Sequence, residues 1–182
     1  MEQEKPAGRD GGGGLAPGRE VTVEFLDIAY GGRGVAKCDG MVLFAAGALP
    51  GETASVRVER VSRGHAEGRV VRILRAAPDR VSPRCAHYDR CGGCALQHLE
   101  SGAQVGAKAA QVNALLRRIG GLSAIPVRSA AVPGEVWRYR FRVDFDWDRD
   151  RDGETILGLH ARERPHGVVA IHDCLLASET AN

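Results

Sequence analysis

Between residues 20 and 78, short runs of alternating apolar and polar side chains are separated by turn signals. In EVTVEFLDIAY (residues 20–30), Val21, Val23 and Phe25 alternate with Thr22, Glu24 and Leu26, which suggests a strand. Two short strands are predicted around the Asp39-Gly40 hairpin signal, and two longer strands on either side of Gly64. Several short strands separated by turns predict a small β-barrel of the OB type.

The pattern changes after Pro78. Apolar side chains recur at intervals of three and four residues and predict an amphipathic helix that ends at Gly120-Gly121; they are Val105, Ala109, Val112, Leu116 and Ile119. The segment WRYRFRVDFDWD (residues 137–148) then alternates strictly between apolar and charged side chains. This alternation predicts a strand that buries the face from Trp137 to Trp147. TILGLHAR and GVVAIHDC are predicted to follow as strands, the second ending at Cys174.

These patterns predict a mainly β, α+β chain in four parts. Residues 1–19 are rich in Gly, Pro and charge and are predicted to be a disordered tail. Residues 20–78 form the barrel, and residues 79–98 a cysteine-containing loop. Residues 99–182 form the start of an α+β domain with a helix and an antiparallel strand pair.

Composition narrows the class of protein. No apolar run approaches the roughly 20 residues that a membrane-spanning helix needs, and the first residues lack the apolar core of a signal peptide. We therefore expect a cytoplasmic protein that does not contact a membrane, and we expect a monomer. In a reducing cytosol a disulfide framework is improbable, and an odd number of cysteines, five, also fits one poorly.

Three of these cysteines are clustered. Cys85, Cys91 and Cys94 follow one another at spacings of six and three residues, and Cys174 lies eighty residues further on. Three close cysteines with one remote partner favour an iron–sulfur cluster, whose iron binds soft thiolates, and Gly92 and Gly93 would let the loop approach it closely. A zinc site, which usually takes two close pairs, and a redox Cys-x2-Cys remain alternatives. Cys38 is predicted to be an unpaired thiol.

Basic side chains suggest a nucleic-acid partner. Seven arginines between residues 57 and 80 face only three acidic residues in the same stretch, which suits a phosphate backbone. Arg138, Arg140 and Arg142 share one face of the predicted strand and could track successive phosphates. The alternative for the barrel arginines is a solvated arginine-rich face, and the alternative for Arg138, Arg140 and Arg142 is cross-strand pairing with acidic neighbours. The candidate RNA-binding residues are Arg33, Arg57, Arg60, Arg138, Arg140 and Arg142.

Four segments together resemble one enzyme family. GGRGVAKCDGMVLFAAGALPGE followed by HAEGRVVRIL resembles a TRAM domain, a small RNA-binding barrel. CAHYDRCGGCALQHL resembles the cluster loop of the RNA uracil-C5 methyltransferases. WRYRFR resembles a strand of that family, and HDCLLAS its last cluster cysteine. The order of the segments and their approximate gaps also match.

The resemblance implies that Cys85, Cys91, Cys94 and Cys174 hold a [4Fe–4S] cluster and that residues 20–78 are the TRAM domain. It also implies a tRNA or rRNA partner, which residues 95–182, as the start of a central domain, help to grip. The family transfers a methyl group from S-adenosylmethionine to C5 of a flipped-out uridine, with a cysteine nucleophile and a carboxylate base.

The sequence departs from the family pattern in one respect. No glycine-rich nucleotide loop, Asp-Pro-Pro-like segment or Ser-Cys-Asn segment is present, so no catalytic residue is assigned and S-adenosylmethionine is not expected to bind this chain. We therefore expect the N-terminal portion of such a methyltransferase. A stand-alone TRAM-type RNA-binding protein and a zinc-clipped nucleic-acid-binding module are the alternatives.

Overall fold

The computed structural model describes residues 14–122, 127, 136–162, 164 and 166–182. These residues divide into two compact units. The first contains the residues up to Asp27 together with Gly34–Arg75, and the second contains Ile28–Arg33 together with Ala76–Asn182. The predicted cysteine loop and the segment after it therefore belong to the same unit. Most of the predicted tail, residues 1–13, lies outside the described residues.

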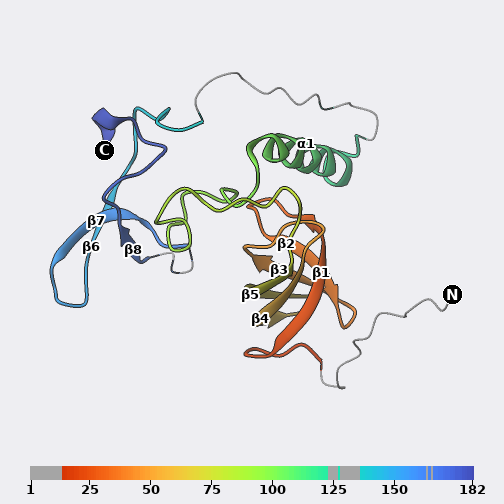
Figure 1. Cartoon of the computed structure of the whole chain (residues 1–182). Helices are drawn as coiled ribbons and strands as arrows, with labels where there is room; N and C mark the ends of the chain where they lie inside the picture. Colours follow the sequence, from red (N-terminus) through yellow and green to blue (C-terminus); the bar gives the residue numbers. More distant parts are fainter. Residues whose placement is uncertain (1–13, 123–126, 128–135, 163, 165) are drawn as a thin grey trace. The chain divides into compact units, whose positions relative to one another are not determined.

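The first unit is a closed five-stranded barrel, as predicted (Figure 1). Its strands run in the order β1-β2-β3-β5-β4 and are β1 (Glu20–Ile28), β2 (Gly34–Cys38), β3 (Met41–Ala46), β4 (Thr53–Ser62) and β5 (His65–Arg75). β3 and β5 pair in parallel, whereas β1–β4, β2–β3 and β4–β5 pair antiparallel. Both turn residues between β2 and β3, Asp39 and Gly40, have positive φ, which is the backbone that the Asp-Gly signal favours.

The barrel interior is filled by the alternate residues of its strands. Val23 and Phe25 of β1 are buried as the alternation predicted, and they meet small and branched side chains of the other strands, including Leu43, Val56 and Val58. Gly68 of β5 is required by this packing, because a Cβ there would lie 2.5 Å from the Arg57 carbonyl oxygen of β4.

Residues before the predicted boundary at residue 20 already contact the barrel. The backbone N–H of Gly18 donates to the Val58 carbonyl (2.8 Å), and the Val58 N–H donates to the Arg19 carbonyl (2.8 Å). Leu15 also packs against the barrel core. Residues 15–19 thus extend the pairing of β1 with β4, a contact that their Gly- and Pro-rich sequence does not suggest.

The second unit contains one long helix and a three-stranded sheet. Helix α1 (Ser101–Arg118) begins where the Glu100 carboxylate accepts from the Ala103 N–H (3.0 Å) and ends just before the predicted Gly120-Gly121 stop. The predicted apolar stripe remains partly exposed, since no helix residue is fully buried. The sheet has the antiparallel order β6 (Asp146–Arg149), β7 (Thr155–His160) and β8 (Val168–Ala170).

The long strand predicted over residues 137–148 is wrong in both length and burial. Only its last part is strand β6, and Arg138 has φ +58°, which breaks the alternation of sides. Residues 138–140 instead lie beside residues 175–178, through backbone bonds such as Arg140 N–H to the Leu176 carbonyl (2.8 Å). The face predicted to be buried carries exposed aromatic side chains: Tyr139 (51%), Phe141 (87%) and Trp147 (65%).

Candidate metal centre

The four cysteines of the predicted ligand set line one cavity of about 250 Å³. Cys85, Cys91 and Cys94 come from the loop before α1, and Cys174 comes from the segment after β8. All four are free thiols. Apolar side chains such as Leu159 and Leu176 form much of the remaining wall, so the cavity combines thiols with a largely apolar lining.

The cysteine loop is a series of tight turns held against the end of β7. The Cys91 N–H donates to the His87 carbonyl (2.8 Å), and the Gly92 N–H donates to the His160 carbonyl (2.9 Å). The Gly93 N–H points at the sulfur of Cys91 (3.4 Å), which is the sulfur-directed backbone geometry expected of this Gly-Gly pair.

Arg162, which sequence reasoning missed, holds the same loop from the side. Its Nη2 donates to the carbonyl oxygens of Tyr88 (3.0 Å) and Cys94 (2.6 Å), and its guanidinium carbon lies 4.8 Å from the centre of the Tyr88 ring. The Tyr88 hydroxyl in turn contacts the buried His98 ring and donates to the Ala95 carbonyl. Nothing in the local sequence around Arg162 indicates this contact, because its partners lie 68 and 74 residues away.

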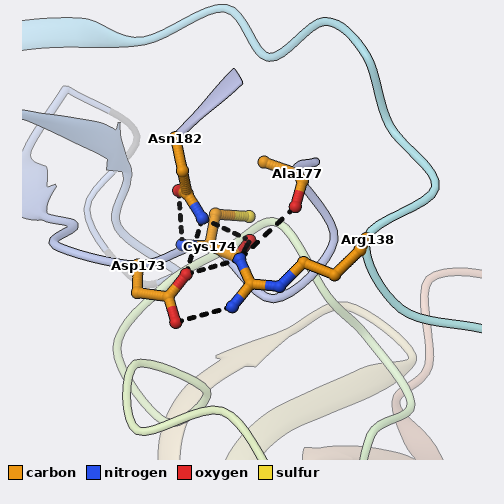
Figure 2. A network of polar contacts seen from close by, with 5 residues as sticks. All are labelled: Arg138, Asp173, Cys174, Ala177 and Asn182. Carbon is orange, nitrogen blue, oxygen red and sulfur yellow. Dashed lines mark hydrogen bonds and ion pairs between the residues drawn. The ribbon is translucent and has the colours of Figure 1, made fainter. Parts of the chain in front are cut away.

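Cys174 is held by a polar network that Figure 2 shows from close by. Arg138 makes a bidentate ion pair with the Asp173 carboxylate (2.6 and 2.8 Å), and its Nη1 also donates to the carbonyls of Cys174 (3.3 Å) and Ala177 (3.4 Å). The Cys174 N–H donates to Asn182 Oδ1 (2.9 Å). The backbone on both sides of the remote cysteine is therefore fixed by side chains.

Burial and neighbouring groups shift the pKa values of side chains at the cavity. Burial raises the pKa of the Cys94 thiol; a hydrogen bond from Gln97 lowers it, and negative charge on the other three cysteines raises it further. The Arg138 guanidinium holds the pKa of Asp173 below its usual value, first through their hydrogen bonds. Cys38 belongs to the barrel unit, where burial raises the pKa of its thiol.

The donor set and the space fit a group larger than one ion. A single zinc ion binds four ligands at about 2.3 Å for sulfur, so its thiolates converge closely. Within the residues that the structure describes, no three His, Cys, Asp or Glu side chains are grouped in this way. The cavity of about 250 Å³ is several times the roughly 30 Å³ share of one water molecule. Four soft thiols around such a space suit a multi-iron core.

Comparison with known proteins places this arrangement in a family context. Residues 15–71 match the TRAM domain model. The chain is 40% identical over 160 residues to an uncharacterised RNA methyltransferase of Halalkalibacterium halodurans, covering 88% of this chain and 34% of the relative. It is 41% identical over 158 residues to a 23S rRNA (uracil-1939-C5)-methyltransferase of Dichelobacter nodosus, covering 87% and 37%.

A solved structure shows the same relationship. The tRNA (uracil-54, C5)-methyltransferase of Pyrococcus abyssi, in complex with S-adenosyl-L-homocysteine, superposes with a TM-score of 0.53 at 25% identity. The match covers 87% of this chain and 33% of that one. The chain is a homologue of the RNA uracil-C5 methyltransferases. It spans about a third of the length of the curated relatives that it matches.

The TRAM barrel of this methyltransferase homologue does not present its arginines as an uncompensated patch. Glutamates on neighbouring strands or on the same barrel face pair with four of the seven arginines: Arg57 with Glu20, Arg60 with Glu67, Arg69 with Glu59 and Arg75 with Glu24. The hydrogen bond from Arg57 lowers the pKa of Glu20. Ion pairs with glutamates, which the sequence analysis did not predict for the barrel, thus engage four of these seven arginines.

The structure separates the other predicted RNA-binding residues. Arg33 is exposed in the segment between β1 and β2, which belongs to the second unit. Arg138 is committed to Asp173 and to the backbone around Cys174. Arg140 and Arg142 both line the cysteine cavity, and Arg142 also pairs with Asp144 (2.9 Å). The three arginines therefore do not form one row of equivalent side chains, as the predicted strand required.

Proposed function

We propose that this chain supplies RNA binding and a [4Fe–4S] cluster to an S-adenosylmethionine-dependent RNA uracil-C5 methyltransferase. The observation that carries the proposal is the meeting of all four family-pattern cysteines at one cavity of a TRAM-containing chain. The TRAM domain and the RNA methyltransferase relatives imply that RNA is the partner.

Each part of the chain has a defined place in this proposal. Cys85, Cys91, Cys94 and Cys174 would hold the cluster, which supplies four iron–thiolate bonds and a redox couple when bound. Because these ligands come from two distant segments, the cluster would join the loop before α1 to the segment after β8. We further propose that these residues form the N-terminal portion of the enzyme, that methyl transfer takes place outside them, and that the protein works in the cytoplasm as a monomer.

Structure near the cysteines also suggests how the protein prepares this site. Arg162 and Arg138 fix the backbone of the loop and of the remote cysteine, respectively, so the thiols face the cavity before any cofactor arrives. His87 lines the cavity too, but four thiols already complete the ligand set of a four-iron cluster, and no ligand role is proposed for it.

The test is the metal content of protein made with ample iron and purified without oxygen. We expect about four irons per chain and a brown colour. Cys174→Ala should leave a labile or incomplete cluster, whereas Cys38→Ala, the matched control in the barrel, should leave it intact. Stoichiometric zinc without iron, or equal behaviour of the two variants, would contradict the proposed ligand set.

A further inference from the structure

The second unit carries a further groove that shares a wall with the cysteine cavity. Its volume is about 570 Å³, within the range of roughly 300 to 1,000 Å³ that is usual for ligand sites. It lies among the N-terminal half of α1, the end of the cysteine loop and residues 136–140. Neither the TRAM match nor the cysteine pattern predicts it.

The side chains around this groove have one sign of charge. Three cations line it, Arg84, Lys108 and Arg140, and among its described lining residues there is no aspartate or glutamate. The whole chain has nearly balanced charge, with 25 basic and 23 acidic residues, so this local excess is not a consequence of composition. A groove whose only charged side chains are positive attracts an anionic ligand.

Aromatic rings accompany these cations. The Arg84 guanidinium carbon lies 5.6 Å from the centre of the Trp137 ring, and that of Arg140 lies 5.9 Å from the Tyr139 ring. Half of Tyr139 is exposed, although its position in the alternating sequence predicted burial. Cations and aromatic rings are the two elements with which proteins bind single-stranded nucleic acid, because bases stack on the rings while cations meet phosphates.

The TRAM barrel offers a contrast. Its arginines at positions 57, 60, 69 and 75 each pair with a glutamate, so a phosphate would have to compete with a carboxylate for each of them. Within the described residues, neither Arg84 nor Lys108 forms an ion pair, and no acidic side chain lines the groove. Phosphate binding in the groove therefore displaces solvent rather than a protein partner.

We propose that this groove binds single-stranded RNA, with one base stacked on Tyr139 and Trp137 and the neighbouring phosphates held by Arg84 and Lys108. The inference rests on the proposed function, because it assumes that RNA is the partner. It adds the strandedness of the RNA and the place where it binds. Paired RNA is excluded from this mode because its base faces are already stacked within the helix.

The groove would also couple RNA binding to the metal centre. Gly93 and Cys94 form part of its wall, and Arg140 lines both the groove and the cysteine cavity. An RNA strand in the groove would therefore lie beside one cysteine ligand, and loss of the cluster would loosen one side of the groove.

Trp137 is the reporter that locates the RNA. The chain has two tryptophans, and the other, Trp147 on β6, does not line the groove. In a Trp147→Phe variant of the whole chain, Trp137 fluorescence is therefore the only tryptophan signal. Titration with a short, dye-free single-stranded oligouridylate should quench this fluorescence, whereas a duplex of the same length should do so at least tenfold less effectively.

Binding measured by fluorescence anisotropy tests the individual side chains. Tyr139→Ala should weaken the binding of a labelled oligouridylate by about 5- to 150-fold, the range for one stacked base, and Tyr139→Phe should restore most of it. Replacing both Arg84 and Lys108 with Gln should lower the slope of log affinity against log salt by about 1.4, close to 0.7 for each phosphate contact. Arg151→Gln, in the exposed turn between β6 and β7, is the matched control and should change neither value.

The possible results separate this inference from the proposed function. RNA binding without Trp137 quenching, with equal affinity for the Tyr139→Ala and control proteins, would place the RNA elsewhere and overturn the groove while leaving the proposed function standing. Equal quenching by single-stranded and duplex RNA would overturn the single-strand preference. If the intact protein bound neither RNA, both the groove and the RNA-binding part of the proposed function would be wrong.

Discussion

Arg138 and Arg57 carry the same guanidinium group but bind different partners with it. Arg57 reaches across the barrel surface to Glu20, and both side chains are largely exposed, so their pair contributes little stability. Arg138 uses its planar fork for a bidentate pair with Asp173 and has donors left for two backbone carbonyls beside Cys174. This geometry is specific to arginine, since a lysine ammonium cannot reproduce the fork.

Arg138 should therefore act as a positioning residue for the fourth cysteine. In Arg138→Gln we expect the iron content to fall from about four to about three per chain, with the electron paramagnetic resonance signal of a three-iron cluster after oxidation. Arg138→Lys, which keeps the charge without the fork, should give an intermediate result. Arg151→Gln is the control, and an unchanged spectrum in Arg138→Gln would show that Cys174 needs no such support.

At the scale of elements, the glycines of the sheet and of the helix in the second unit differ in the space around them. A Cβ at Gly158 of β7 would lie well inside contact distance of the Val169 carbonyl oxygen of β8. A Cβ at Gly106 of α1 would meet nothing within 4 Å. The two elements of the same unit thus respond in opposite ways to the same added methyl group.

Alanine substitutions at these two glycines should move stability in opposite directions. Gly158→Ala should destabilise the second unit by about 2 kcal/mol or more, because β8 must move away from β7. Gly106→Ala should stabilise α1 by about 0.5 to 1 kcal/mol, because alanine loses less backbone freedom in a helix. Urea unfolding of the second unit, followed by amide signals from α1 and β7, measures both. A shift in the same direction for both variants would contradict the close β7–β8 contact at Gly158 or the open space at Gly106.

At the scale of the whole molecule, the two compact units depend on different stabilising interactions. The barrel buries a continuous core of Val, Leu, Phe and Ala side chains. Of the largest fully buried side chains among the described residues, only His98 belongs to the second unit, and the helix of this unit contains no buried residue. Its cysteine loop and the segment around Cys174 are held mainly by hydrogen bonds and ion pairs, so a cluster joining them would be a major part of its structure.

Removal of the metal should therefore affect the units unequally. After oxidation and chelation of iron, we expect amide hydrogen exchange to quicken in residues 85–94 and 174–178 and to stay unchanged in β1–β5. The physical reason is that none of the four cavity cysteines contributes to the barrel core. Equal loss of protection throughout the chain would show that the barrel depends on the metal centre.

No helix in the described part of the chain is long and apolar enough to span a membrane. The overall charge of +2 says little about partners. The proposed RNA recognition would therefore depend on the local distribution of charge. Four of the seven arginines between residues 57 and 80 pair with glutamates, whereas no acidic side chain among the described residues lines the groove.

The sequence by itself determined the features that depend on neighbours along the chain. The barrel strands follow from alternation, the β2–β3 turn from Asp39-Gly40, and α1 from its helical spacing. The cysteine set was recognisable because three members lie close together and the fourth matched a family pattern. All of these signals are local, or are carried by residue type.

Only the tertiary structure decided which charged side chains form ion pairs or hydrogen bonds and which aromatic rings are buried. Arg138 meets Asp173 across 35 residues, and Arg162 meets the carbonyl of Cys94 across 68, so no local pattern could reveal either pair. Alternation predicted a buried aromatic face over residues 137–148, but burial requires a second layer of structure. Within the described residues no such layer covers Tyr139 or Phe141. The same backbone path that exposes Tyr139 places it in one groove with Arg84 and Lys108, where three separate segments converge.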